Sequence, residues 1–170
     1  IEPGTPLPKE MGNFWPSKIN KLLLEKLLHS HLCENVPVTR QYPTVVGQVT
    51  NGEVNWQCIV VHKGRRNPLI DLQSSIEEAD LRILLHVLDS LETGHKVCVI
   101  ISNDTDVSVA LLYHMPIFLQ QGIKELWVRA GVGDTTRYIP LHTLFKRLGH
   151  NMCAVLPAVH SLTGCDITSK

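Results

Sequence analysis

The run Lys96–Ser102 constrains the fold more than any other segment, because it is short and almost wholly apolar. A run of this kind suits a central strand of a parallel sheet, buried on both faces. Periodic apolar residues predict helices on either side, at 75–92 and at 105–114, the second broken near Pro116, and another strand is expected at 125–129. Helix, buried strand, helix and strand in succession predict an α/β fold.

Further elements flank this pattern. A helix is expected at 17–32 with Ser17 as its N-cap, because a serine side chain can accept a hydrogen bond from the first helical turn. Asn51-Gly52 lies between two strand-like runs, 45–50 and 53–61, and is a strong β-hairpin signal. The remaining expected elements are a basic loop at 62–68, a turn at 131–134, a returning strand at 137–139, and helices at 140–148 and 151–163.

Length and composition limit the class of protein. A chain of 170 residues with 44% hydrophobic residues can bury a sizeable core, which favours one globular domain. Within it we expect a partial N-terminal region, 1–74, and a core, 75–170, as parts of a fragment of a larger protein. The 16 basic and 16 acidic residues cancel, so nucleic-acid binding needs a local basic patch. Lys63, Arg65 and Arg66 are the candidates for it.

The five cysteines and nine histidines give no zinc signature. The cysteines are odd in number and no pair has C-x-x-C spacing, which favours reduced thiols in an intracellular protein, with the nucleus as a candidate compartment. The histidines are scattered without the spacing of zinc ligands. No apolar run reaches the ~18 residues of a membrane-spanning helix, so we expect no membrane partner.

Acidic residues gather on three short segments at the boundaries of expected elements. They are Glu78 and Asp80 at the start of one helix, Asp104 and Asp106 after the apolar strand, and Asp166 after the last helix. Ligands of open α/β sheets bind beyond the carboxyl ends of the strands, where Asp104 and Asp106 fall. Carboxylates gathered at such an edge can bind Mg²⁺ or Mn²⁺, because hard divalent cations prefer oxygen ligands.

Each segment also has a purely structural interpretation. Asp104 can cap the helix that follows it, although capping explains one acid and not two. Glu77 or Glu78 can complete a capping box, and acids in a first helical turn are favoured by the helix dipole. Asp166 after Gly164 can be an ordinary turn residue. Position alone favours a ligand role for Asp104 and Asp106, and the three segments taken together favour one shared metal site.

The order of these segments resembles the PIN-like nuclease superfamily, and most closely its flap-endonuclease and five-prime-exonuclease branch. Glu78-Ala79-Asp80 resembles the acidic segment with which that branch opens a helix, and Ser102–Asp106 resembles its Ser/Thr-x-Asp-x-Asp strand end. Leu162–Asp166 is similar to its Leu-Gly-Cys-Asp segment, with one threonine inserted. The resemblance covers about residues 75–166, and the same segments, with Arg137–Pro140, are similar to uncharacterised animal proteins, some linked to mobile elements.

This resemblance implies a three-layer fold with a mainly parallel central sheet, a β-hairpin insertion and a nuclease core over 75–170. It also implies hydrolysis of phosphodiester bonds in DNA or RNA with the help of Mg²⁺ or Mn²⁺. The implied metal ligands are Glu78, Asp80, Asp104, Asp106 and Asp166, and the first four would be the catalytic residues.

The chain departs from the family pattern in its N-terminal part. The family also uses acids on N-terminal strands, and residues 1–70 contain no Asp, so we expect those strands to be missing. Residues 1–170 should then cleave poorly, and the alternative is a catalytically incomplete PIN-like module that binds nucleic acid or protein. Asp104-Thr-Asp-Val107 is also similar to the nucleophile motif of haloacid-dehalogenase-type phosphatases, but the acids upstream and downstream fit the nuclease better.

Asp166 can join the other acids only if helix 151–163 packs against the sheet. Leu156, Val159 and Leu162 recur at helical spacing, and we expect them to form the packing face.

Overall fold

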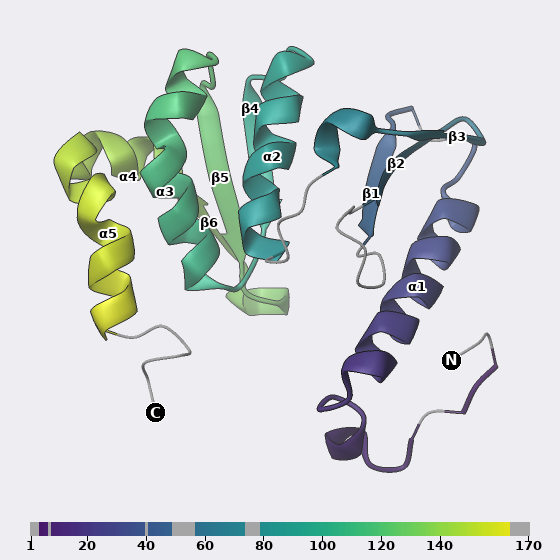
Figure 1. Cartoon of the computed structure of the whole chain (residues 1–170). Helices are drawn as coiled ribbons and strands as arrows, with labels where there is room; N and C mark the ends of the chain where they lie inside the picture. Colours follow the sequence, from purple (N-terminus) through teal and green to yellow (C-terminus); the bar gives the residue numbers. More distant parts are fainter. Residues whose placement is uncertain (1–3, 7, 40, 49–56, 74–78, 164–170) are drawn as a thin grey trace. The chain divides into compact units, whose positions relative to one another are not determined.

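The structure is a computed structural model that describes residues 4–6, 8–39, 41–48, 57–73 and 79–163. The chain divides into two compact units, Ile1–Glu77 and Glu78–Lys170. Within the described residues it is an α/β protein with five α-helices and two small three-stranded sheets (Figure 1).

The N-terminal unit packs one helix against an antiparallel sheet. Its elements are η1 (Met11–Asn13), α1 (Lys18–Asn35), β1 (Thr44–Gln48), β2 (Gln57–His62), β3 (Arg65–Pro68) and η2 (Ile70–Leu72). The Ser17 side chain accepts a hydrogen bond from the backbone N–H of Asn20 at 3.3 Å, which confirms the expected N-cap. Strands β1 and β2 pair antiparallel, as the hairpin signal predicted, while Asn51-Gly52 lies outside the described residues.

The basic loop expected at 62–68 is wrong, because most of this segment forms a second hairpin. Lys63 and Gly64 both have positive φ, 50° and 76°, and turns of that handedness join two antiparallel strands. Arg65–Pro68 therefore pairs with β2, with His62 opposite Arg65. Glycine takes positive φ at little cost, but lysine rarely does. Of the two turn residues, only Gly64 is therefore typical of such a turn, and the sequence did not predict the hairpin.

The C-terminal unit contains the expected succession of helices and strands. Its elements are α2 (Ala79–Glu92), β4 (Val97–Ile101), α3 (Thr105–Gln120), β5 (Glu125–Ala130), η3 (Gly133–Thr135), β6 (Arg137–Pro140), α4 (Leu141–Leu148) and α5 (His150–Thr163). The sheet has the order β4-β5-β6, in which β4 and β5 are parallel and β6 is antiparallel to β5. The capping box expected at 74–78 lies outside the described residues.

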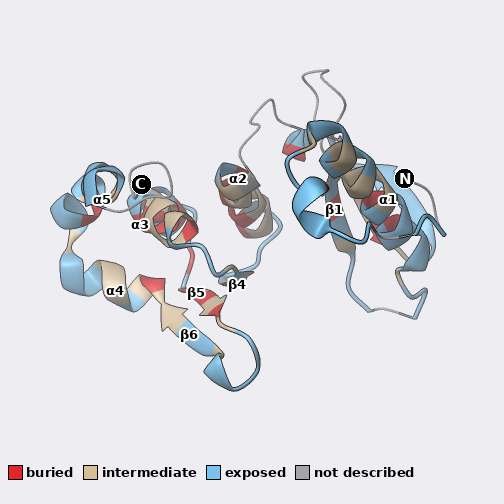
Figure 2. Cartoon of the chain, turned by 90° about the horizontal axis from the view of Figure 1, so that it is seen from below, coloured by how far each residue is buried: buried red, intermediate tan, exposed pale blue. Residues whose placement is uncertain are grey.

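The helices α2, α3 and α5 lie on one side of this sheet (Figure 2). The hydrophobic core between these helices and the sheet includes Leu111, Met115, Phe118 and Leu126, all fully buried. On the other face the side chains of β4 alternate outward, so Val97, Val99 and Ile101 are exposed.

The expectation that 96–102 is a central strand buried on both faces is therefore wrong for the described residues. Its parallel pairing with β5 is confirmed, but β4 is an edge strand with one open face. The pair β4–β5 is also the one parallel pair among the described strands, so the mainly parallel sheet is not seen there. An apolar run fits a strand, but its place in a sheet depends on which other segments pair with it.

Helix α3 continues through Pro116 to Gln120, where the sequence predicted a break. A proline in a helix interior costs about 3 kcal/mol, because it removes a hydrogen bond and clashes with the preceding turn. Met115 and Phe118, on either side of it, are fully buried. Full burial of such a side chain contributes roughly 1.5–3 kcal/mol, so the two together match or exceed the cost of the proline.

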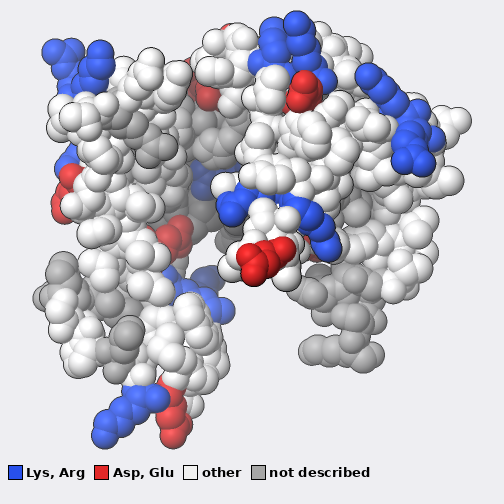
Figure 3. Space-filling model, turned by 180° about the vertical axis from the view of Figure 1, so that it is seen from behind, with Lys and Arg blue, Asp and Glu red and all other residues white. Residues whose placement is uncertain are grey.

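Charged side chains are dispersed over the face drawn in Figure 3. On the face drawn in Figure 3, Lys and Arg side chains form separate small groups with acidic side chains near several of them. Lys63, Arg65 and Arg66 are exposed on the β2–β3 hairpin of the N-terminal unit. None of the described helices combines the length and apolar character needed to cross a membrane.

Candidate functional site

Asp104 and Asp106 lie where β4 ends and α3 begins, as the sequence predicted. Asp104 is the N-cap of α3, because its Oδ1 accepts a hydrogen bond from the backbone N–H of Asp106 at 2.9 Å. The backbone N–H of Asp104 in turn donates to Ser102 Oγ at 3.0 Å. The capping interpretation is thus correct for Asp104. A cap uses one carboxylate oxygen, and the exposed Asp104 makes no other hydrogen bond to the described residues.

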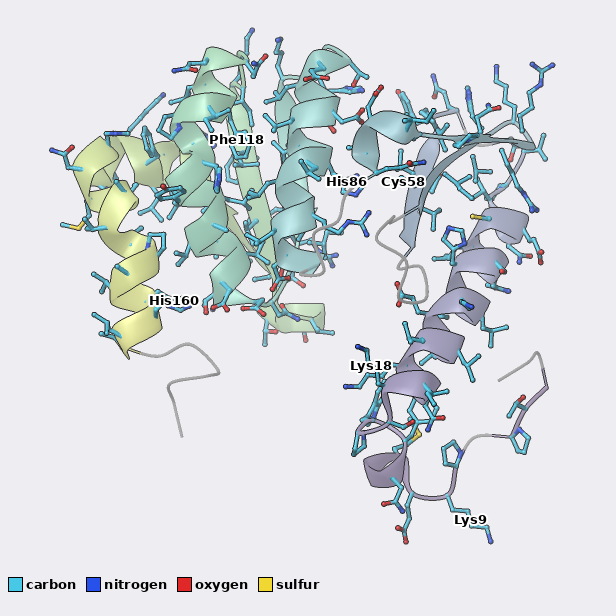
Figure 4. All side chains as sticks on the ribbon, in the orientation of Figure 1. Lys9, Lys18, Cys58, His86, Phe118 and His160 are labelled. Atoms are coloured by element: carbon cyan, nitrogen blue, oxygen red, sulfur yellow. The ribbon has the colours of Figure 1, made fainter. Side chains whose placement is uncertain are left out.

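Asp106 contacts a histidine from the other end of the unit. His160 Nε2 lies 2.5 Å from Asp106 Oδ1, although 54 residues separate the two in sequence. A carboxylate only accepts hydrogen bonds, so Nε2 of His160 is the donor. Figure 4 shows His160 directed from the last part of α5 toward the start of α3. The contact therefore joins the C-terminal end of α5 to the acidic pair.

The packing face of α5 differs from the one expected. Leu156 packs against the core as predicted, but Val159 and Leu162 are 47% and 83% exposed. Cys153 is fully buried and His160 lies on the same side of the helix, so the buried face follows the spacing 153, 156 and 160. The prediction selected only large aliphatic residues, whereas a free cysteine packs like a small hydrophobic residue and a histidine can be held by an acid.

The first turn of α2 lies at the same edge of the sheet. Figure 1 shows the first turns of α2 and α3 together at the end where β4 finishes. Asp80, which is half-buried, belongs to the first turn of α2. Glu78 and Asp166 lie outside the described residues. The structure thus brings three of the five expected acids to one edge of the unit.

These acids do not make a complete metal site by themselves. Within the described ranges, no group of three or more His, Cys, Asp or Glu side chains is placed to hold a metal ion. One oxygen of Asp104 is used by the cap and one oxygen of Asp106 by His160. Since Mg²⁺ needs six ligands in near-octahedral geometry, a metal site at this edge requires further ligands, for which Glu78 and Asp166 are the candidates.

A pocket of about 370 Å³ opens at the carboxyl ends of β4 and β5. It is lined by Ile101, Ser102, Asn103, Arg129 and the turn Gly131–Gly133. Asn103 Oδ1 accepts a hydrogen bond from the Gly131 backbone N–H at 2.6 Å, which ties the two strand ends together. Our sequence analysis missed Arg129. The sequence signal for Arg129 as a site residue was its position as a basic residue at the end of the strand expected at 125–129. The strand expected at 96–102, which precedes Asp104, ends at the same edge if the two strands are parallel.

A second pocket of about 550 Å³ lies between α3 and α5, with Asp106 and His160 among its lining residues. Most of its surface is apolar, with Val109 and Ala110 contributed by α3. Tyr113, from the same helix, is half-exposed in this pocket. The acidic pair thus has an apolar pocket on its helical side and the Arg129 pocket at the strand ends.

His86 lies in a third pocket, of about 330 Å³, beside β4. Burial lowers the pKa of His86 from its ordinary value of 6.5, and the positive charge of Arg82 lowers it further, while Asp89 acts in the opposite direction. Burial also raises the pKa of the Cys98 thiol, which lines the same pocket. Among the described residues, Cys33, Cys98 and Cys153 are buried and form no disulfide.

Comparison with known proteins gives no relative for this chain: no family model, no curated protein and no solved structure matches it. The function is therefore inferred from the geometry of the site and from the resemblance of its motifs.

Proposed function

We propose that this chain is a divalent-metal-dependent, nuclease-like domain that hydrolyses phosphodiester bonds in DNA or RNA. The contact between His160 and Asp106 supports this most strongly. It carries the end of α5, from which the chain continues to Asp166, to the acids at the start of α3. The PIN-like arrangement implied by the motifs requires this approach, and α-helical periodicity alone did not predict which face of α5 would make it.

In this proposal Glu78, Asp80, Asp104, Asp106 and Asp166 bind Mg²⁺ or Mn²⁺. Such an ion, when bound, lowers the pKa of an attacking water and stabilises the leaving oxygen. The protein's own contribution is to hold the carboxylates in place. Asp104 is positioned by the helix cap and Asp106 by His160, so neither side chain needs the metal for its orientation. Lys63, Arg65 and Arg66 would contact the phosphate backbone.

The test separates metal binding from helix capping. Asparagine caps a helix about as well as aspartate, so Asp104→Asn removes the charge and keeps the cap. We expect Asp104→Asn and Asp106→Asn each to weaken Mn²⁺ binding, measured by isothermal titration calorimetry, with little change in melting temperature. The loss should exceed the roughly 10- to 100-fold effect typical of residues that only support a metal ligand.

The control is Asp134→Asn, which removes an exposed acid of η3 that belongs to none of the three segments. It should leave Mn²⁺ affinity unchanged. If the parent chain binds Mn²⁺ and both Asp104→Asn and Asp106→Asn bind it equally well, the acidic site is not the metal site and the proposed hydrolysis loses its basis.

A catalytically incomplete binding module is the second candidate function. It is favoured by the lack of a three-ligand metal group in the described ranges and by the use of Asp106 as the partner of His160. This candidate predicts that the chain binds nucleic acid or protein but no Mn²⁺. Calorimetry on the parent chain, followed by a cleavage assay with labelled DNA and RNA, distinguishes the two candidates.

A further inference from the structure

We propose that the open face of the β4–β5–β6 sheet binds single-stranded nucleic acid at its carboxyl edge, with Arg129 contacting a phosphate and Tyr138 stacking on a base. This inference rests on the proposed function in one respect, the choice of nucleic acid as ligand. It adds a binding site on the C-terminal unit that uses neither the acidic residues nor the exposed hairpin with Lys63 as ligand contacts.

The strand register places Arg129 and Tyr138 side by side. Arg129 lies opposite Ile101 on β4 and opposite Tyr138 on β6. Directly paired residues of neighbouring strands project from the same face of a sheet. The next row, Val128 with Ile139, packs into the core, so the Arg129 row projects from the open face. The result is a short row of an aliphatic, a basic and an aromatic side chain.

Among the described residues, none is a partner for the Arg129 side chain. It is half-buried in the pocket of about 370 Å³, and its guanidinium makes no hydrogen bond or ion pair with any residue that the structure describes. A guanidinium has five N–H donors in a planar fork that matches phosphate oxygens. An anion in this pocket would satisfy them.

The rest of the pocket favours a phosphate group. Ser102 Oγ already accepts a hydrogen bond from the Asp104 N–H, so its own O–H is free to donate to a ligand. Gly133 has a positive φ of 55°, and a Cβ at this position would meet no atom within 4 Å, so the backbone there is open to a ligand. The pocket also lies beyond the carboxyl ends of two parallel strands, the usual ligand edge of an α/β sheet.

Tyr138 supplies the contact that distinguishes a nucleotide from free phosphate. Its side chain is 57% exposed, although it belongs to a strand whose next residue packs into the core. Bases of a single strand stack on such aromatic side chains, whereas bases of a duplex are already stacked on each other. Because neighbouring strands are about 4.8 Å apart, Tyr138 and Arg129 can contact a base and an adjacent phosphate of one strand.

The location joins this site to the acidic residues. Ser102 and Asn103 line the pocket and directly precede Asp104. A phosphate held by Arg129 would therefore lie close to the acidic pair, and the positive charge of Arg129 would offset the repulsion from Asp104 and from the exposed Asp134 on the neighbouring turn.

The experiment measures binding without metal. Fluorescence anisotropy of residues 1–170 with a labelled single-stranded oligonucleotide, as DNA and as RNA, is recorded in EDTA at several salt concentrations. The variants are Arg129→Gln and Tyr138→Leu, with Arg147→Gln and Tyr42→Leu as matched controls on other exposed surfaces. Circular dichroism and thermal unfolding confirm that each variant is folded.

We expect Arg129→Gln to weaken binding by roughly tenfold and to lower the salt slope by about one. Tyr138→Leu should weaken it by roughly 5- to 150-fold, the range of one lost base stack. Both controls should stay within about twofold of the parent, and a duplex of the same sequence should bind more weakly. Equal affinities for the parent, Arg129→Gln and Tyr138→Leu overturn the inference, as does the absence of binding in the parent.

Two further arms separate the ligand sources and the two proposals. If inorganic phosphate protects the parent against thermal unfolding through Arg129 while Tyr138→Leu leaves oligonucleotide affinity unchanged, the site takes free phosphate and the nucleic-acid inference is wrong. Arg129→Gln should not weaken Mn²⁺ binding, and Asp104→Asn should not weaken oligonucleotide binding in EDTA, because each change removes a charge that repels the ligand in question. Oligonucleotide binding without Mn²⁺ binding would support this inference and refute metal-dependent hydrolysis. Mn²⁺ binding without oligonucleotide binding in EDTA would refute this inference and leave the proposed metal site standing.

Discussion

Replacement of Gly131 by alanine should destabilise the C-terminal unit far more than the same change at Gly133. Both glycines belong to the turn after β5 and both have positive φ. They differ in what surrounds them. A Cβ at Gly131 would lie 2.2 Å from the backbone oxygen of Thr135 and 2.8 Å from its carbonyl carbon, whereas a Cβ at Gly133 would meet no atom within 4 Å.

The two costs can be estimated separately. Left-handed backbone costs an L-residue roughly 1–2 kcal/mol, and this cost applies at both positions. A Cβ contact below 3.0 Å is essentially never seen, so Gly131→Ala must also displace the backbone of Thr135. Forcing one extra carbon into a packed site adds typically 1–3 kcal/mol. We therefore expect losses of about 1–2 kcal/mol for Gly133→Ala and about 2–5 kcal/mol for Gly131→Ala.

Urea denaturation measures both losses if the signal comes from the C-terminal unit alone. The chain has three tryptophans, and Trp127 lies on β5, so a Trp15→Phe, Trp56→Phe background leaves one fluorescent reporter in this unit. The displaced turn should also weaken oligonucleotide binding, since Gly131 lines the Arg129 pocket. Equal free energies of unfolding for the two variants would show that the close approach of Thr135 to Gly131 is not as described.

Three other predictions follow from particular side chains. Asp104→Ala should lower the free energy of unfolding by about 0.5–2 kcal/mol in urea denaturation, because it removes the N-cap of α3, while Asp104→Asn should cost little. Leu111→Ala should cost about 2–5 kcal/mol in the same assay, because Leu111 is fully buried in the core. The lowered pKa of His86 means that the folded state disfavours protonation of this side chain. Below pH 6.5 the unfolded chain takes up a proton more readily than the folded one, so the free energy of unfolding should fall as the pH drops below 6.5, while above pH 6.5 His86 causes no such loss. His86→Gln should reduce this loss, and an unchanged slope of stability against pH below 6.5 would refute the assignment to His86.

The acidic site was predicted in part because its residues sit at element boundaries. Asp104 follows a short apolar run and precedes a periodic one, so its place at a strand end and a helix start follows from local sequence. His160 and Tyr138 carry no such signal, and Arg129 carries only its position at the end of the strand expected at 125–129. His160 reaches Asp106 only because α5 packs on α3, and Arg129 meets Tyr138 only through strand register. The convergence of Glu78 and Asp166 on this site stays a prediction.

The elements that could be predicted from the sequence are those with local signals: the capped helix α1, the hairpin of β1 and β2, and the helix–strand–helix–strand order from α2 to β5. Periodicity and caps involve residues within one or two turns, so no distant contact is needed to read them. Tertiary structure alone decided that α3 continues through Pro116, that β4 has an open face, and that α5 turns His160 rather than Val159 toward its neighbour. Each of these features depends on how much apolar surface is buried by segments that are distant in sequence. That burial is set by tertiary packing and cannot be read from local sequence.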